Sequence, residues 1–152
     1  MKAIAKTTVA AMLLFSGSAF AGVIAPDDVQ FVEATVSTSL TGQAGDPAKG
    51  RDWFANRKLG NCLACHANSN LSEEQFHGEI GPYLDGVAST YSEAELRAIV
   101  INSKAVFGEE TIMPAFYRVS GLSRVAKKFK GKPILSAEQV EDIVAYLATL
   151  KE

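Results

Sequence analysis

The sequence predicts a small all-α domain preceded by an extended arm, and three observations lead to this fold class. No segment alternates apolar and polar residues for long enough to form a sheet strand. Two segments open with a serine followed three residues later by Glu or Gln, which is the capping box that starts a helix. Each box is followed by apolar residues at helical spacing, and no internal repeat is present.

Residues 1–21 have the pattern of a secretory signal peptide. Two lysines precede a short apolar core at residues 8–15, and Ala19-Phe20-Ala21 is a small-x-small cleavage pattern. The core is less than half as long as the stretch of about 20 residues that a membrane-spanning helix needs. We therefore expect a soluble mature chain that starts at Gly22 and lies in the periplasm.

The charge balance excludes some classes of partner. The chain has 15 basic and 17 acidic residues, and loss of the two signal-peptide lysines leaves a net charge of −4. A net charge this small predicts neither nucleic acid nor a membrane surface as a partner. Residues 59–96 contain six acids and no base, whereas residues 111–137 contain six bases and no acid. The asymmetry indicates either two solvated surfaces or a dipole that steers the molecule toward a charged partner.

The first helix follows the arm, residues 22–45, and begins the main domain, residues 46–152. The arm has acidic residues but no basic ones, many Thr, Ser and Gly, and no helical period. Asp46 is a good N-cap acceptor, and the proline after it loses no hydrogen bond at the first helical position. We expect this helix to run to about Lys58, with Gly50 packed closely against the last helix.

Cys62-Leu63-Ala64-Cys65-His66 has the C-x-x-C-H spacing by which a c-type haem is attached. Two thiols at this spacing can each add to one vinyl group of a haem that lies against the same turn of backbone. The next imidazole then points at the iron as its proximal ligand. Cys62 and Cys65 are the only cysteines of the chain, so the motif predicts one covalent haem c.

Other uses of two close cysteines fit the sequence less well. A thioredoxin-like redox pair would need a βαβ setting, and the pattern contains none. A zinc site would need a second pair of ligands, but the only other histidine is His77. A disulfide across two intervening residues closes too small a loop to stabilise the fold much.

A polar stretch, residues 68–79, follows the motif and leads to Gly81-Pro82. The Pro82 carbonyl is placed to accept the Nδ1–H of His66, which would fix the tautomer of the iron ligand and raise its basicity. A simple turn is the alternative interpretation of this dipeptide.

The second helix begins at the capping box formed by Ser92 and Glu95, and we expect it to end near Asn102. A loop through Met113-Pro114 follows. Residues 118–134 mix basic residues with Gly and Pro, and the sequence assigns them no regular structure.

Met113 is the predicted sixth ligand of the iron. It is the only methionine that remains after residues 1–21 are removed, and Pro114 restricts its backbone to extended conformations. A thioether ligand raises the reduction potential, which suits an electron carrier. The alternatives are a core methionine, ligation by His77, which lies close after His66 in sequence, and an iron left open for substrate.

The last helix has the clearest pattern. Ser136 is its N-cap, Gln139 completes the capping box, and Leu135 with Val140 fits a hydrophobic staple. Apolar residues then repeat at helical spacing at Val140, Ile143, Val144, Leu147 and Leu150.

These residues together resemble the class I cytochromes c over nearly all of positions 46–151. The motifs that carry the resemblance are Gly50…Phe54, Cys62-x-x-Cys65-His66, Gly81-Pro82-x-Leu84, Met113-Pro114 and Val144-Ala145-Tyr146-Leu147. A finer resemblance is to the SoxX family, the small haem subunits of sulfur-oxidising SoxAX cytochromes. It rests on Ser39-Leu40-Thr41-Gly42, Gly45-Asp46-Pro47, the segment from Gly60 to His66, and Met113-Pro114-Ala115-Phe116.

The SoxX resemblance implies a site and a set of partners. Cys62 and Cys65 would hold the haem, with His66 and Met113 as axial ligands. The family pairs with the larger cytochrome SoxA in the periplasm, and together they join thiosulfate oxidatively to a cysteine of the carrier SoxYZ, an L-cysteine S-thiosulfotransferase activity. The chain itself is expected to accept electrons from the catalytic subunit and pass them to a soluble cytochrome c. A free periplasmic electron shuttle is the alternative, and a haem enzyme with a displaceable ligand is a third.

Overall fold

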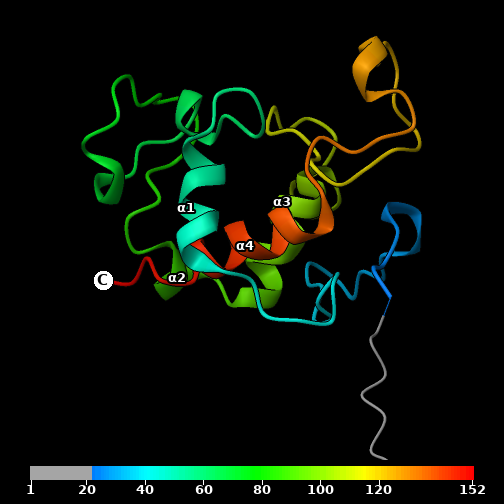
Figure 1. Ribbon diagram of the computed structural model, residues 1–152, viewed down its shortest axis with the longest axis horizontal. Helices are drawn as coiled ribbons and strands as arrows, with labels where there is room; N and C mark the ends of the chain where they lie inside the picture. The colour runs from blue at the N-terminus through cyan, green and yellow to red at the C-terminus, as the bar shows by residue number, and fades with distance from the viewer. Residues whose placement is uncertain (1–21) are drawn as a thin grey trace, which may run out of the picture.

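The computed structural model describes residues 22–152, so the predicted signal peptide lies outside the described residues (Figure 1). The described part is helical, and its only strand-like pairing is an isolated bridge between Val32 and Thr35. No helix in residues 22–152 has the length and apolar character needed to cross a membrane. The α-helices are α1 (Pro47–Ala55), α2 (Val87–Thr90), α3 (Glu93–Phe107) and α4 (Ala137–Leu147), and the short 3₁₀ helices are η1 (Pro26–Asp28), η2 (Cys62–Ala64), η3 (Ser69–Leu71) and η4 (Lys127–Phe129).

The three predicted helix starts are confirmed by their N-caps. The Asp46 side chain accepts from the first turn of α1, and complete capping boxes begin α3 at Ser92 and α4 at Ser136. The first helix ends at Ala55, about three residues earlier than expected. The short helix α2 was not predicted.

The helix α1 crosses α4 so closely that only glycine fits at the contact. A Cβ atom on Gly50 would lie 1.8 Å from the Asp142 carbonyl oxygen and 2.8 Å from the Tyr146 Cβ. The rings of Phe54 and Tyr146 pack edge to face beside this point, with centroids 5.6 Å apart. The predicted packing of Gly50 against the last helix is therefore confirmed.

Two adjacent acids of α4, Glu141 and Asp142, are buried and bind the elements around the helix. Asp142 accepts from the Asp46 backbone N–H at 2.7 Å and from the Trp53 indole N–H at 3.1 Å, which ties α1 to α4. Glu141 accepts from the Arg97 guanidinium at 3.0 Å, which ties α3 to α4. Burial alone would lower the pKa of Arg97, but its hydrogen bonds with Glu141 raise it above the usual value.

The arm, residues 22–45, packs along its own domain. Val36 and Leu40 are buried in the core at 2% and 0% exposure. Arg97 Nη1 donates to the Val36 carbonyl at 3.1 Å, and Glu141 accepts from the Leu40 N–H at 2.9 Å. The arm shows no helical period because isolated apolar residues, rather than one helical face, attach it to the core.

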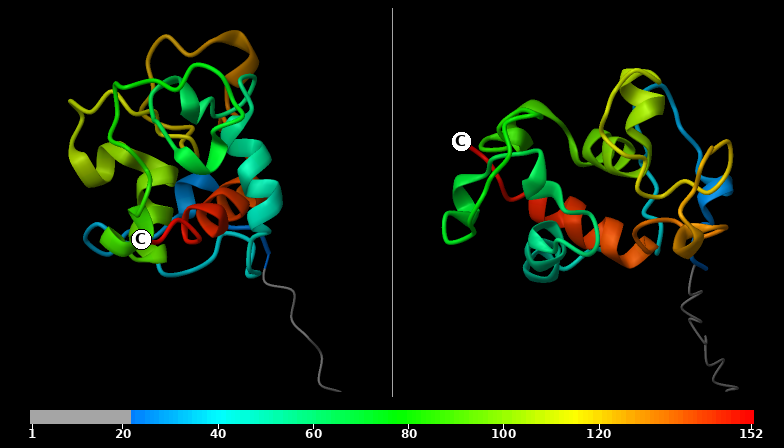
Figure 2. Two further views of the ribbon diagram at one scale, coloured as in Figure 1. Left: turned by 90° about the vertical axis from the view of Figure 1, so that its left-hand side faces the viewer. Right: turned by 90° about the horizontal axis from the view of Figure 1, so that it is seen from above.

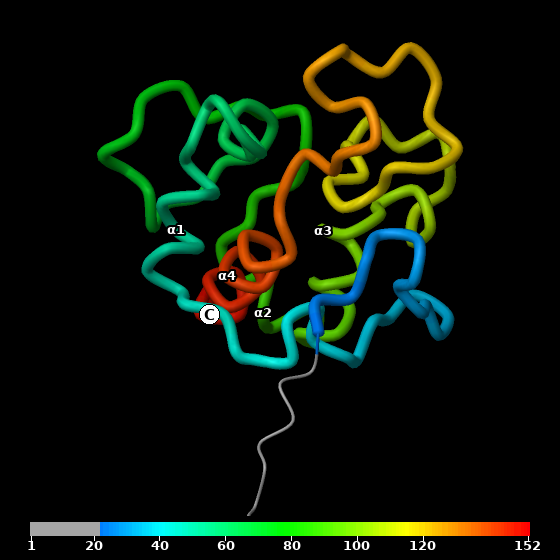
Figure 3. The backbone as a smooth tube through the Cα atoms, turned by 45° about the vertical axis from the view of Figure 1, so that its right-hand side comes forward, coloured from blue at the N-terminus to red at the C-terminus, as the bar shows by residue number. Residues whose placement is uncertain are grey.

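Two long loop segments rise on opposite sides of the helices, as Figures 1 and 3 show. Residues 59–86, in green, contain the C-x-x-C-H motif, and residues 108–135, in yellow and orange, contain Met113. The view from above in Figure 2 shows the same separation. The fold therefore brings the two predicted axial ligands from different sides of the molecule.

The helix α3 extends beyond its predicted end but is kinked there. Asn102 has φ −151° and ψ 84°, which are not helical values, and the helix resumes after it to Phe107. The prediction of an end near Asn102 thus located a real break. The helix continues because Ile101 and Ser103 are buried on either side of the kink.

Replacement of Gly50 by Ala should destabilise the fold, because the added Cβ overlaps the Asp142 carbonyl and pushes α1 away from α4. Overpacking of this kind costs about 1–3 kcal/mol. Ala has the higher helix propensity, by up to about 1 kcal/mol, so a stabilised variant would contradict the close crossing. Denaturant unfolding of the mature protein measures the change, and Asp52→Ala, on the exposed side of α1, is the matched control.

Candidate functional site

The C-x-x-C-H residues lie on one tight turn, as the attachment chemistry requires. Asn61 precedes η2 in a left-handed conformation, with φ 50° and ψ 44°. The backbone N–H groups of Cys65 and His66 both donate to the Cys62 carbonyl, at 3.1 and 3.0 Å. The turn therefore presents both cysteines and the imidazole from a single backbone unit.

Neither cysteine is in a disulfide, and the environment of Cys62 disfavours thiolate chemistry. Burial raises the pKa of the Cys62 thiol to about 12, so the group is a neutral thiol at physiological pH. Redox cysteines instead have lowered pKa values. Residues 22–152 also contain no group of three or more Cys, His, Asp or Glu side chains arranged to hold a metal ion. The raised pKa of Cys62 gives no support to a thioredoxin-like redox pair.

The loop after the motif folds back along it through three backbone hydrogen bonds. The N–H groups of Gly78, Gly81 and Leu84 donate to the carbonyls of Leu63, Cys65 and Ala67, at 2.7, 2.7 and 3.0 Å. Because these acceptors flank His66 on both sides, the loop holds the backbone of His66 in place.

The His66 ring is oriented by Pro82 and Gly81. His66 Nδ1 lies 2.8 Å from the Pro82 carbonyl oxygen, which is the contact that the sequence predicted. A carbonyl can only accept, so Nδ1 carries the proton and Nε2 keeps its lone pair for a metal. A Cβ on Gly81 would lie 2.4 Å from Cε1 of the imidazole, so the ring packs directly on the glycine backbone.

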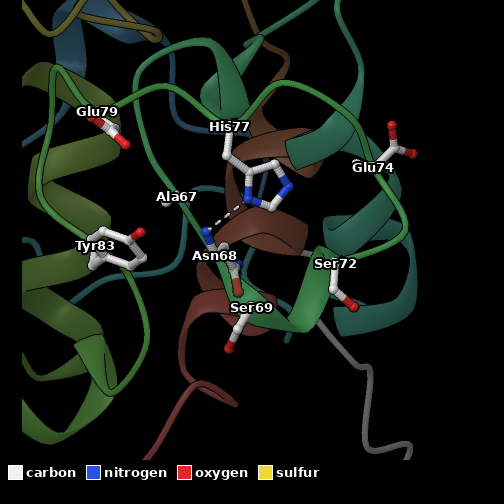
Figure 4. A pocket seen from close by; sticks show the side chains of 8 residues that line it. All are labelled: Ala67, Asn68, Ser69, Ser72, Glu74, His77, Glu79 and Tyr83. Atoms are coloured by element: carbon white, nitrogen blue, oxygen red, sulfur yellow. Dashed lines mark hydrogen bonds between the residues drawn. The ribbon is translucent and has the colours of Figure 1, made fainter.

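The competing histidine, His77, has no free ring nitrogen. Its Nδ1 accepts from the Asn68 backbone N–H at 3.3 Å, and its Nε2 donates to the Leu71 carbonyl at 3.1 Å. Figure 4 shows the ring at a pocket of about 350 Å³, which Glu79 and Tyr83 also line. Neither His66 nor Met113 lines this pocket. In this conformation His77 is a structural histidine.

Met113 is partly buried and packs against the same core cluster as Cys62. A Cβ on Gly60 would lie 3.2 Å from the Cys62 sulfur and 3.8 Å from the ring of Phe116, which follows Met113 in its loop. The Phe116 and Tyr117 N–H groups donate to carbonyls of α3, at 3.4 and 3.0 Å. The structure thus attaches the Met113 loop to the core on which the motif also rests.

Arg51, Arg57, Arg97 and Trp53 are the candidate side chains for binding the haem propionates, and all four have protein acceptors. Arg51 donates to the Asn70 carbonyl at 2.9 Å and also pairs with Glu73. Arg57 donates to the Gln75 carbonyl at 3.1 Å. The donors of Arg97 and Trp53 bind the buried acids of α4. These four side chains stabilise the polypeptide itself, which their sequence positions did not reveal.

The residues present fit a haem. His66 is held with its Nε2 lone pair available, on a glycine that makes room for the ring. Asn102, at the kink of α3, has a buried Oδ1 atom with no hydrogen-bond partner in the described residues. Buried polar atoms are rarely left unpaired, so this atom indicates that water or a bound group completes the interior here.

Comparison with known proteins assigns the family. The family model described as Cytochrome c matches residues 47–151. A search of curated proteins gives no match. Among solved structures, the crystal structure of SoxXA from P. pantotrophus matches with a TM-score of 0.79 and 47% sequence identity, over 84% of this chain and 98% of that chain.

The chain therefore belongs to the cytochrome c family, with the all-α class I fold that the sequence predicted. The resemblance to SoxX is confirmed, and with it a covalently bound haem c and a role in electron transfer. The haem supplies an iron that changes reversibly by one electron. The polypeptide supplies the ligands, their orientation and the exclusion of water.

The sequence did not reveal the residues that support the two predicted axial ligands, His66 and Met113. The N–H groups of Gly78 and Leu84 and the buried hydroxyl of Ser103 make their contacts across loops. Neither periodicity nor motif spacing marks such contacts. The Gly81-Pro82 dipeptide was the one signal in the sequence, and it correctly indicated the loop that contacts His66.

Replacement of Gly81 by Ala should displace the His66 imidazole, because the new methyl group would overlap Cε1 and break the Pro82 contact. Loss of such support typically weakens metal binding by about 10–100-fold. We expect a smaller fraction of low-spin iron, measured by electron paramagnetic resonance of the purified holoprotein. Glu79→Ala, two residues earlier and exposed, is the control, and an unchanged spectrum in Gly81→Ala would contradict the proximal assignment.

Proposed function

We propose that this chain is the monohaem electron-transfer subunit of a periplasmic, thiosulfate-oxidising SoxAX complex. It pairs with a SoxA-type cytochrome subunit as a heterodimer and serves a SoxYZ-type carrier only indirectly. It accepts electrons from the catalytic subunit and delivers them to a soluble cytochrome c. The observation that carries this proposal is the similarity to SoxXA, which extends over almost the whole of that chain.

The ligand set favours an electron relay over an enzyme. In this proposal Cys62 and Cys65 hold the haem covalently, and His66 and Met113 occupy the two axial positions. The iron then has no open face for a sulfur compound. Both cysteines are used, so the chain has no thiol left to act as a nucleophile.

The electron count requires a second redox partner. Joining thiosulfate to a thiol releases two electrons, and a single haem iron accepts one. One turnover therefore needs either two haem centres or two visits to this one. A subunit that relays single electrons away from a catalytic partner fits this chain, which has one C-x-x-C-H motif.

The charge distribution supports docking to a partner with an acidic surface. The loop that ends at α4 exposes five bases, at Arg124, Lys127, Lys128, Lys130 and Lys132. Exposed charges of one sign steer association with a partner of opposite charge and are screened by salt. An acidic surface on the soluble acceptor suits this loop.

The arm offers a partner only its exposed side chains. Val36 and Leu40 are buried within the chain, so a partner has access only to the exposed side chains of residues 22–45, which include Val23 and Val32. The acids Asp27, Asp28 and Glu33 are among them. Pairing with a SoxA-type subunit therefore depends on preformed surface rather than on folding of the arm.

Replacement of Met113 by Ala should open the iron. We expect complete loss of the weak long-wavelength absorption band that marks an iron–thioether bond in the oxidised protein. The reduced variant should bind carbon monoxide, which the reduced wild type at neutral pH should not, and the reduction potential should fall because the thioether is gone. Ile112→Ala, at the exposed neighbouring position, is the control, and carbon monoxide binding to the wild type would favour a haem enzyme.

Co-expression with a SoxA-type subunit tests the pairing. We expect the mature holoprotein to elute in size-exclusion chromatography as a one-to-one complex at moderate salt. A class I cytochrome c from an unrelated pathway, mixed with the same subunit, should elute separately. If this chain also remains a monomer, it is a free periplasmic shuttle and the SoxAX assignment fails.

A further inference from the structure

Ser103 is fully buried, and its hydroxyl group contacts the backbone of the loop that carries Met113. Its Oγ donates to the Met113 carbonyl at 2.6 Å and lies 3.3 Å from the Pro114 carbonyl. A buried hydroxyl without a partner is costly, so this hydrogen bond is strongly retained. The bond reaches the residue whose side chain is the proposed sixth ligand.

The kink of α3 creates this contact. The non-helical backbone of Asn102 separates the two halves of the helix. On one side of it, the carbonyls of Val100 and Ile101 accept from the loop N–H groups of Phe116 and Tyr117, at 3.4 and 3.0 Å. The helix is thus joined to the loop on the C-terminal side of the methionine.

The second half of the helix holds the other side of the loop. Lys104 Nζ donates to the Thr111 carbonyl, which precedes Met113 in the loop. Ser103 lies between these two sets of attachments, and it is the one that acts on Met113 itself.

The local chain makes this attachment important for the thioether. A methionine side chain has three rotatable bonds, so its sulfur is positioned only as well as its backbone is. Pro114 limits the Met113 backbone to extended conformations but has no N–H to fix the peptide by a hydrogen bond. The Met113 carbonyl is therefore the atom through which the protein holds this residue, and Ser103 holds that carbonyl.

We propose that Ser103 is a positioning residue for the sixth ligand, whose hydrogen bond to the Met113 carbonyl holds the thioether against displacement from the iron. This inference rests on the proposed function, in which Met113 is that ligand. Without the bond, the loop moves more freely and an external ligand competes more successfully for the iron. The secondary structure does not depend on this bond, because the loop keeps its attachments at Thr111, Phe116 and Tyr117.

The test compares Ser103→Ala with the wild-type holoprotein, using imidazole as the external ligand of the oxidised iron. Loss of one hydrogen bond should make imidazole bind about tenfold more tightly. The long-wavelength iron–thioether band should weaken, and the reduction midpoint should shift downward. Ser103→Thr retains a hydroxyl and should restore imidazole affinity and the band toward wild-type values.

Ser92→Ala is the matched control, because it removes a hydroxyl that caps the same helix at its far end. It should lower stability by about as much as a lost N-cap does, yet leave imidazole affinity unchanged. Equal tightening in Ser92→Ala, or no tightening in Ser103→Ala, would overturn the positioning role. If Ser103→Thr does not fold because of its extra methyl group, the comparison of Ser103→Ala with Ser92→Ala still tests the positioning role.

The variants of Ser103 and Met113 distinguish failure of the Ser103 inference from failure of the proposed function. If Met113→Ala loses the iron–thioether band while Ser103→Ala behaves as the wild type, only the role of Ser103 fails. If Met113→Ala keeps the band, Met113 is not the ligand and the proposed electron-relay site fails with it.

Discussion

The arrangement of this protein depends on two adjacent buried acids of α4. Asp142 binds the N-cap residue and the indole of α1, and Glu141 binds Arg97 of α3 and the backbone of the arm. Removing one partner of a buried ion pair costs about 3–5 kcal/mol, because the remaining charge is stranded. These acids place α1, which leads into the haem motif, and α3, which supports the Met113 loop, around one helix.

The two proposed axial ligands are supported in different ways. His66 is held by a loop close to it in sequence, through backbone hydrogen bonds and the Pro82 carbonyl. Met113 is held by a helix, through a kink that turns carbonyls and the Ser103 hydroxyl toward its loop. The proximal side is therefore a local unit that forms with the motif, whereas the distal side requires α3 and the loop to be in place.

This division suits a relay of single electrons. In the proposed ligand set, a histidine with a fixed tautomer and a thioether whose loop is held by α3 would keep the surroundings of the iron similar in both oxidation states. With both cysteines used for the haem and both axial positions filled, as proposed, the sulfur reaction would take place on another chain. In the proposed function this subunit presents its haem to two partners in turn, and its uneven surface charge favours directed encounters.

Much of the site was predictable from the sequence because it rests on short-range geometry. The N-caps at Asp46, Ser92 and Ser136, the C-x-x-C-H turn and the Pro82 contact all involve residues near one another along the chain. Residue spacing also indicated the all-α class, because a helical period is visible within a single segment. The sequence located the break in α3 at Asn102. It predicted a helix end rather than a kink, because both leave the same local sequence pattern.

The tertiary structure alone decided which polar residues are buried. Glu141 and Asp142 belong to an amphipathic helix on which acids are expected to face water, yet they lie inside because α1, α3 and the arm bring donors to them. The same holds for the arm, whose few apolar residues become core only where α3 and α4 meet. Burial depends on which residues pack together in space. These neighbours are often distant along the chain, so the pattern of a single segment does not identify them.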